Sequence, residues 1–281
     1  MSIADTHVHF VRQEMPSTNT RSTQAALGAI VLQLDDFDLA AFLPVAAAFG
    51  LDRYGFVVTP NVDHMIRYHE ESFFRECYRA ASYVLLDSRI ARHLLRVFKG
   101  IRVGVCTGSD LTAAIFSQLI GADDRVLLIG GGARQAQALA ETYQLRNLHH
   151  HNPPMGFIKD AAAVERCLDF IENLSPFRFC FLAVGCPQQE ALAYALQKRG
   201  RARGLALCVG ASIDFLTGNE RRAPLWMQKA SIEWLFRLLQ NPRRLARRYL
   251  VRGPKVFAQV VRSEFVVRSR GLSCKMAVGS P

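Results

Sequence analysis

The sequence repeats one local pattern, in which a short apolar run ends in a glycine or amide turn and a segment with helical spacing follows. The pattern is complete at 125–143 and again at 179–200. Further apolar runs that end in polar or glycine turns lie at 29–34, 54–61, 83–89, 101–110 and 205–218. Strands buried on both faces of a parallel sheet have continuous apolar runs of this length. The sequence therefore predicts an α/β fold, with a mostly parallel sheet covered by helices on both faces.

Single carboxylates stand in the turns where the predicted strands end: Asp87, Asp110, Glu190 and Asp214. The carboxyl ends of parallel strands meet along one edge of the sheet, which is where open α/β sheets bind ligands. A carboxylate at such a position can act as a general base. It can equally cap the next helix, and for Asp110 both interpretations stay open.

Three glycines, Gly130 to Gly132, follow the apolar run at 125–129. Backbone N–H groups there can hold a diphosphate at the N-terminus of the next helix. A dinucleotide fingerprint does not fit, because Gln135 stands where its third glycine would fall and His149 to His151 occupy the place of its acidic residue. The pattern argues against an NAD-dependent oxidoreductase. Two interpretations of the glycine-rich turn stay open: it binds the diphosphate of a sugar nucleotide, or it is a tight turn without a ligand.

Two motifs contain residue types that bind metals. The adjacent histidines, His149 to His151, would point in different directions, so the sequence favours a solvated loop over a metal site. Asp36-Phe37-Asp38 matches the short DxD motif of metal-dependent sugar-nucleotide enzymes, and Asp35 to Asp38 can equally be a helix cap. Neither motif is a strong metal site, and no metal is expected.

The net charge of +11 is concentrated at one end of the chain. Residues 221–281 hold 14 Lys and Arg but 2 Asp and Glu, so residues 1–220 are close to neutral. We therefore expect a catalytic α/β domain over 1–220, with 1–27 as a loose lead-in, and a basic helical appendage over 221–281. A basic segment of this kind has an anionic partner, such as a membrane surface, a polyphosphate substrate or a nucleic acid.

The end of the appendage has the pattern of an amphipathic helix. Its apolar face would consist of Val256, Phe257, Val260, Val261 and Phe265. Basic amphipathic helices lie on anionic membranes, and the alternative is a helix packed on its own domain or on a sister subunit. The predicted membrane residues are Arg243, Arg244, Arg247, Arg248, Arg252, Lys255 and Arg262. A non-enzymatic alternative is a nucleic-acid-binding protein that uses 221–281, although its aromatic residues form no base-stacking motif.

The chain has no apolar run of the roughly 18 residues that a membrane span needs, and its first residues contain no secretory apolar segment. Its seven cysteines are scattered, and no CxxC pair occurs. This usage argues against a disulfide framework and a structural zinc site, and it favours a reducing cytoplasm.

A set of short motifs occurs in a fixed order between about 57 and 249. They are Thr59-Pro60-Asn61 with Asp63; Asp87; Gly108-Ser109-Asp110; Gly130-Gly131; Pro153-Pro154 with Gly156-Phe157; Gly185 with Pro187, Gln189 and Glu190; Gly210 with Asp214 and Gly218; Arg222-Ala223-Pro224 with Trp226; Glu233-Trp234 with Arg237; and Pro242, Arg243, Arg247, Arg248 and Tyr249. In this order the chain resembles the WecG/TagA/CpsF family, glycosyltransferase family 26.

The resemblance implies a Rossmann-like fold with a C-terminal appendage that serves the membrane and the active site. It implies a peripheral enzyme on the inner, cytoplasmic face of the bacterial plasma membrane, with the possibility of a homo-oligomer. The enzyme would move a sugar from a UDP-sugar to a polyprenyl-diphosphate-linked glycan, with inversion to a β-linkage. The product would be an exopolysaccharide, a common antigen or a wall polymer. No cofactor, metal or nucleic acid is implied.

An inverting transfer needs a base for the acceptor hydroxyl and cations or dipoles for the leaving UDP. We expect Asp87 to be the base, with Asp63 as the alternate. Sugar hydroxyls would be held by Thr59, Asn61 and Gln189, since amides both donate and accept hydrogen bonds. Glu190 would cap its helix or orient Gln189. The other predicted substrate-binding residues are Gly108, Asp110, Gly130, Gly131, Gly210, Asp214, Arg221 and Arg222.

The sequence departs from the family pattern at two places that bear on the donor. Ser88 follows Asp87, where the family has glycine, and Val105 stands where many relatives have an arginine that Arg102 could replace. Trp226 and Trp234 are expected to anchor the appendage on the body.

Overall fold

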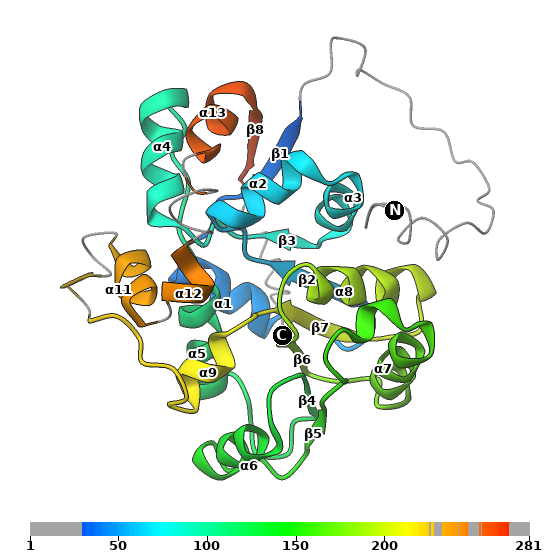
Figure 1. Cartoon of the computed structure of the whole chain (residues 1–281). Helices are drawn as coiled ribbons and strands as arrows, with labels where there is room; N and C mark the ends of the chain where they lie inside the picture. The colour runs from blue at the N-terminus through cyan, green and yellow to red at the C-terminus, as the bar shows by residue number, and fades with distance from the viewer. Residues whose placement is uncertain are drawn as a thin grey trace, which may run out of the picture.

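The computed structural model describes residues 30–224, 226–227, 232–240, 242–246, 253 and 255–269 (Figure 1). The predicted lead-in at 1–27 lies outside these residues. So do Arg247, Arg248 and Arg252 of the predicted membrane set, and the side chains of Arg244, Lys255 and Arg262.

The central sheet has six strands in the order β3-β2-β7-β6-β4-β5. All of its pairings are parallel. The strands are β2 (Tyr54–Val58), β3 (Tyr83–Val84), β4 (Val126–Ile129), β5 (Leu148–His151), β6 (Phe179–Leu182) and β7 (Gly204–Cys208). The α/β fold with a Rossmann-like parallel sheet is therefore confirmed.

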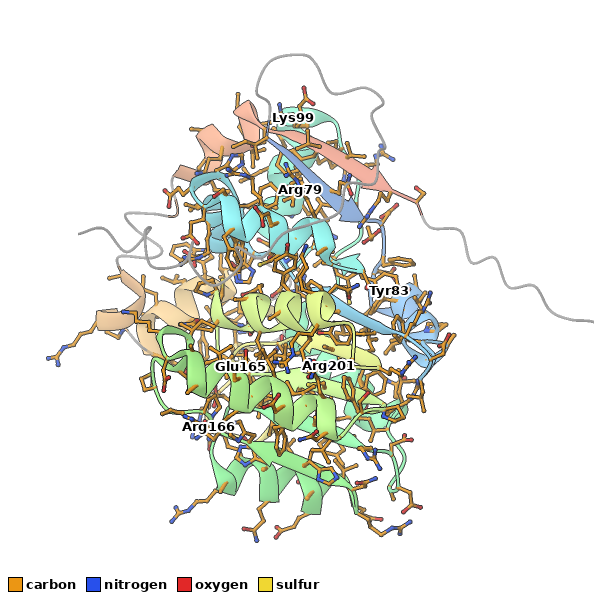
Figure 2. The ribbon with its side chains drawn as sticks, turned by 90° about the vertical axis from the view of Figure 1, so that its right-hand side faces the viewer. Arg79, Tyr83, Lys99, Glu165, Arg166 and Arg201 are labelled. Carbon is orange, nitrogen blue, oxygen red and sulfur yellow. The ribbon has the colours of Figure 1, made fainter. Side chains whose placement is uncertain are left out.

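Side chains alternate between the two faces of this sheet, so each strand contributes to two cores. Phe56, Val58 and Leu182 belong to one core, and Val57 and Phe181 belong to the other. The first core is covered by α2 (Val62–Glu70), α3 (Ser72–Ala80), α7 (Ala161–Asn173) and α8 (Gln188–Arg199). The second is covered by α1 (Leu39–Ala47), α5 (Gly108–Gln118), α6 (Ala133–Thr142) and α9 (Ser212–Leu216). In Figure 2 helices α7 and α8 lie side by side on the near face.

The connections from β4 and β6 run in opposite directions along the sheet, β4 to the edge strand β5 and β6 to the inner strand β7. This reversal makes a topological switch point between β4 and β6, the usual ligand position in open sheets. Gly130 lies there with φ +92°, and a Cβ atom on it would stand 2.8 Å from the carbonyl oxygen of Ala183. Only glycine fits both the backbone conformation and the close approach.

A second, two-stranded parallel sheet pairs β1 (Val31–Asp35) with β8 (Glu264–Arg268), which are far apart in the sequence (Figure 1). A bridge between Asp35 and Leu85 connects it to the extension of β3. The carboxylate of Asp35 is fully buried and accepts hydrogen bonds from the Val84 N–H at 2.8 Å and the Arg268 guanidinium at 2.7 Å. The last strand of the described residues is thus fastened to the first.

The C-terminal helix differs from the prediction. Helix α13 (Lys255–Arg262) ends before Phe265, which lies in β8 because that segment pairs with β1. Val256 and Val260 are 2% and 1% exposed in the first core, whereas Phe257 and Val261 are 49% and 53% exposed. The alternative interpretation, packing on its own domain, is therefore correct for one side of this helix.

Helix α13 packs on α2 and on α4 (Arg89–Lys99). The Lys99 ammonium at the end of α4 donates to the Val261 carbonyl at 2.6 Å, and Figure 2 labels Lys99 at this end of the molecule. Two helices of the C-terminal part meet at Pro242, where α11 (Glu233–Gln240) has ended and α12 (Pro242–Ala246) begins. Trp226 is 64% exposed, so the expected anchoring role is wrong for that side chain, while Trp234 is half-buried.

Two further local predictions need correction. The segment 101–107 forms no strand, because Gly104 packs against the backbone of Phe37 and Cys106 makes a single backbone bond to Leu86. The three histidines form β5 rather than a loop, because the segment pairs with β4. Helix α3 follows α2 almost directly, and a 3-10 turn, η1 (Phe157–Lys159), precedes α7. No helix in the described ranges is long and apolar enough to cross a bilayer.

Candidate active site

Asp87 follows β3 at the carboxyl edge of the sheet and points to the start of α5. Its carboxylate accepts a hydrogen bond from the Gly108 N–H, the first residue of that helix. Burial raises the pKa of Asp87 to about 7, the cation of Arg237 lowers it, and the anions of Glu233 and Asp110 raise it. A carboxylate whose pKa lies near neutrality is suited to general base catalysis.

Arg237 and Glu233 both lie on α11, in the C-terminal part of the chain. Their side chains form an ion pair at 2.7 Å, and the Arg237 guanidinium also stacks over the ring of Phe215, 4.9 Å from its centre. The C-terminal segment therefore contributes charged groups to the surroundings of Asp87. Both residues belong to the motif pattern, but sequence reasoning gave neither one a role.

Asp110 is the third residue of α5, and it is not the helix cap. Thr107 is the cap: its hydroxyl accepts from the Asp110 N–H at 3.1 Å and donates to the Asp110 carboxylate at 2.7 Å. The other carboxylate oxygen pairs with Arg222 at 2.6 Å. This pair brings a guanidinium to the N-terminus of α5, where backbone N–H groups and the helix dipole already favour an anion. Arg221 is exposed, and its carbonyl accepts from Gln240.

Three turns meet beside Gly108. A Cβ atom at Gly108 would stand 3.0 Å from the Thr59 hydroxyl and 3.6 Å from the Ser212 hydroxyl. Thr59 follows β2 and is 7% exposed, and Ser212 begins α9 after β7. The structure thus brings Thr59 and Gly108 together as the resemblance implied, and adds Ser212, which sequence reasoning missed.

Asn61 and Asp63 lie at the start of α2. Asn61 is the helix cap, and its side-chain oxygen accepts from the backbone N–H groups of Asp63 and His64 at 3.0 and 3.2 Å. Asp63 is half-buried in the first turn. The amide oxygen of Asn61 therefore has a structural partner, and its predicted contact with a sugar stays a prediction.

Gln189 joins the turn after β6 to the turn after β7. Its amide donates to the Glu190 carboxylate at 2.9 Å and accepts from the Gly210 N–H at 2.9 Å. Gln189 is 2% exposed and Glu190 is fully buried. Of the two roles expected for Glu190, the structure has the one that orients Gln189, because Pro187 occupies the cap of α8. Burial raises the pKa of Glu190 to about 7, while bonds from Gln189, its own N–H and Cys186 lower it.

The glycine-rich turn is held by Gln135. The side-chain oxygen of Gln135 accepts from the Gly132 N–H at 2.7 Å, and its amide donates to Asp214 at 2.8 Å. Gly130 and Gly131 both have positive φ. The Nε2 atom of His150 is within hydrogen-bond distance of both of their carbonyl oxygens, at 3.1 and 3.3 Å. Gln135 therefore connects Asp214 to the glycine turn. In the sequence, Gln135 served only as evidence against a dinucleotide-binding site.

The two sequence motifs weighed as metal sites have other contacts. Asp38 caps α1, since its carboxylate accepts from the Ala41 N–H at 2.9 Å, and Asp36 accepts from the Gly104 N–H at 2.8 Å. The cap interpretation of this motif is confirmed. His149 bonds to Asn147 at 2.7 Å, and the ring of His151 stacks on Phe170.

The predicted site residues thus lie along one sheet edge in two groups, one around Asp87 and Gly108, the other around Gln189, Gly210 and the glycine turn. The stretch from Gly210 to Ser212 touches both, through Gln189 at one end and Gly108 at the other. A family model described as the glycosyl transferase WecG/TagA/CpsF family matches residues 29–270. Its match includes both sheets, and the chain therefore belongs to the WecG/TagA/CpsF family of glycosyltransferases.

Proposed function

We propose that the protein is an inverting transferase that moves a sugar from a UDP-sugar to a polyprenyl-diphosphate-linked glycan. The observation that carries the proposal is the placement of Asp87, a carboxylate with a pKa near 7, against the N-terminus of α5. In its ionised form Asp87 takes the proton of the acceptor hydroxyl as the oxygen attacks the anomeric carbon. The bond to the UDP oxygen breaks on the opposite side, so the configuration inverts.

The leaving UDP gains negative charge as that bond breaks. Arg222 and the first N–H groups of α5 are the groups that could take up this charge. The turn at Gly130 and Gly131 offers further N–H groups at the switch point. Val105 is half-buried, and Arg102 is exposed. We therefore propose that Arg222, which pairs with Asp110, takes the role of the arginine that many relatives have at the position of Val105.

We further propose that the protein binds the anionic inner face of the bacterial membrane, where a polyprenyl acceptor resides. Phe257 and Val261 on α13 are exposed apolar side chains, and Arg243 on α12 is exposed. Helix α4 lies against α13 and carries Arg92, Arg96 and Lys99. Exposed apolar groups next to basic ones suit an anionic interface.

Transfer itself is the test. The protein would be incubated with a short-chain polyprenyl-diphosphate sugar and, in turn, the UDP derivatives of glucose, glucuronate, N-acetylmannosamine and its uronate. Mass spectrometry would report the lipid product, with EDTA and separately with Mg²⁺ or Mn²⁺. One added sugar from one donor supports the proposal, and β-linkage by NMR supports inversion. No product under any of these conditions counts against the proposed donor and acceptor classes, and nucleic acid would be the next ligand tested.

A further inference from the structure

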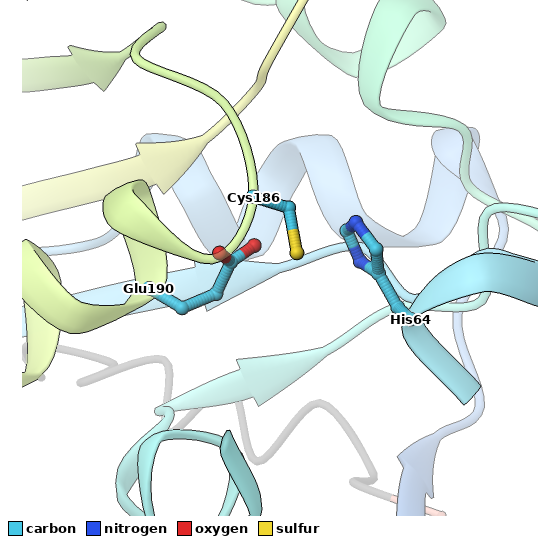
Figure 3. A group of neighbouring side chains, drawn as sticks. All are labelled: His64, Cys186 and Glu190. Carbon is cyan, nitrogen blue, oxygen red and sulfur yellow. The ribbon is translucent and has the colours of Figure 1, made fainter. Parts of the chain in front are cut away.

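Three metal-binding side chains of different chemical types meet behind the turn after β6 (Figure 3). One ligand atom from each of His64, Cys186 and Glu190 lies within 4.8 Å of the others. His64 comes from α2, Cys186 lies in the turn after β6, and Glu190 lies in the first turn of α8. Figure 3 shows the Cys186 sulfur between the imidazole of His64 and the carboxylate of Glu190.

The cluster is largely enclosed by protein, and neighbouring side chains outside it hold two of its members by hydrogen bonds. His64 is 7% exposed and Glu190 is fully buried, while Cys186 is half-buried. The Tyr78 hydroxyl bonds to Nδ1 of His64 at 3.0 Å and fixes the ring. The Gln189 amide likewise fixes one oxygen of Glu190 at 2.9 Å. Support of this kind behind the ligands is typical of metal centres.

One buried carboxylate oxygen of Glu190 has a weak donor beside it, the Cys186 thiol, but no strong one. The second carboxylate oxygen of Glu190, Oε2, is buried and has no conventional hydrogen-bond partner among the described residues. A buried acceptor without a partner costs free energy, so native structures rarely keep one without a reason. A cation bound between this oxygen, the thiolate and the imidazole would satisfy it.

We propose that His64, Cys186 and Glu190 form a zinc site that joins the first turn of α2 to the turn after β6 and the start of α8. A nitrogen, a sulfur and an oxygen donor are the ligands that zinc prefers, and ligand atoms in tetrahedral zinc sites stand about 3.3 to 3.8 Å apart. The separations, 4.8 Å at most, need to close by about 1.5 Å at most, which rotation of the Cys186 and Glu190 side chains can supply. A water molecule would complete the tetrahedron.

The charges of the cluster suit a divalent ion. The thiolate and the carboxylate together neutralise Zn²⁺, and the nearby Arg67 guanidinium is paired with Glu71. The ion would fix the position of Asn61, which caps the helix that carries His64, relative to Gln189, which bonds to Glu190. It acts on the positions of these side chains and contacts no substrate. The site therefore stands or falls independently of the proposed function, and transfer with EDTA does not test it.

Cobalt(II) titration of the full chain tests the site directly, because a cobalt–thiolate bond gives an ultraviolet charge-transfer band. Metal-free protein should develop this band to one equivalent, and Zn²⁺ should abolish it by displacement. Cys186→Ser should remove the band. Glu190→Gln keeps the size of the side chain and should weaken cobalt binding at least about tenfold. Cys167→Ala, which removes a buried thiol of α7, should keep the band.

The absence of a band in the unmodified chain would overturn the proposal and leave a hydrogen-bonded cluster. A band that survives Cys186→Ser would also overturn it, since the thiolate would belong to another site. Circular dichroism establishes that each variant is folded. If Cys186→Ser does not fold, Glu190→Gln decides, and cobalt affinity equal to that of the unmodified chain overturns the site. Zinc should also raise the Tm of the unmodified chain but not of a folded variant.

Discussion

A guanidinium nitrogen of Arg222 lies 2.6 Å from a carboxylate oxygen of Asp110. The pair joins the segment that leads into the C-terminal helices to the first turn of α5. Both side chains are partly exposed, so the ion pair itself contributes little to folding stability. The pair is important because it holds the Arg222 guanidinium at the N-terminus of α5.

Arg222→Ala should therefore lower kcat/KM for transfer by about 100-fold, the effect of removing one charge-stabilising donor, with little change in Tm. Kinetics with the donor found by the product screen measure this. Arg146→Ala is the matched control, because Arg146 pairs with Asp123 near the opposite edge of the sheet and is exposed. An equal loss in both variants would show that Arg222 has no special role.

Asp87→Asn should reduce transfer by at least about 100-fold, because an amide cannot accept the proton. Asn can still accept the Gly108 N–H bond, so UDP binding should persist in isothermal titration calorimetry. Retained turnover would remove Asp87 as the base and make Asp63 the next candidate.

The same substitution should change the pH dependence of stability. Asp87 has a pKa of about 7 when folded and an ordinary value of 3.8. The folded state holds the proton over this interval while the unfolded state releases it, so the group destabilises the protein as pH rises from about 4 to 7. Asp87→Asn should flatten this part of the profile. Urea unfolding of both proteins at pH 5 and pH 8 measures the difference, and parallel profiles would contradict it.

Charge changes on α11 should move the acid limb of the rate profile in opposite directions. The unmodified enzyme should lose kcat/KM below about pH 7, where Asp87 is protonated. Arg237→Gln removes a cation that lowers the pKa of Asp87, so the limb should move to higher pH. Glu233→Gln removes an anion that raises it, so the limb should move to lower pH. Shifts in the same direction would mean that loss of the Arg237–Glu233 pair dominates.

Arg268→Ala should destabilise the protein by about 3 kcal/mol, because it removes the cation bonded to the buried carboxylate of Asp35. Urea unfolding at pH 7 measures this. Gln33→Ala is the control: Gln33 bonds to the same guanidinium from an exposed position, and its loss should cost no more than about 0.5 kcal/mol. A small effect of Arg268→Ala would argue against the pairing of β8 with β1.

Helix α13 should separate stability from membrane binding. Phe257→Ser with Val261→Ser should weaken binding to vesicles that contain phosphatidylglycerol at least about tenfold and leave Tm unchanged, since both side chains are exposed. Val256→Ala should instead cost about 2 kcal/mol of stability and leave binding unchanged, since Val256 is in the core. Co-sedimentation measures binding. Undiminished sedimentation of the double variant would exclude this face as the anchor.

Apolar runs and turn residues were enough to predict the parallel sheet, and the ordered motifs were enough to predict the family. Both depend on short-range patterns, because burial on two faces dictates continuous apolar strands and parallel strands bring their carboxyl ends to one edge. The carboxylates Asp87, Asp110, Glu190 and Asp214, which stand where predicted strands end, were therefore expected along that edge from the sequence alone.

Other properties depended on contacts between distant parts of the chain. The sequence of 255–268 fits a continuous amphipathic helix, and only pairing with β1 makes its last residues a strand. Val256 and Phe257 both fit the predicted apolar face of the helix. Packing of α13 against α2 and α4 buries Val256 and leaves Phe257 exposed. Likewise, no local pattern places Arg237 near Asp87 or His64 beside Cys186. Local propensity and periodicity determined the elements of this protein, whereas the free energy of long-range packing decided which charged and metal-binding groups meet.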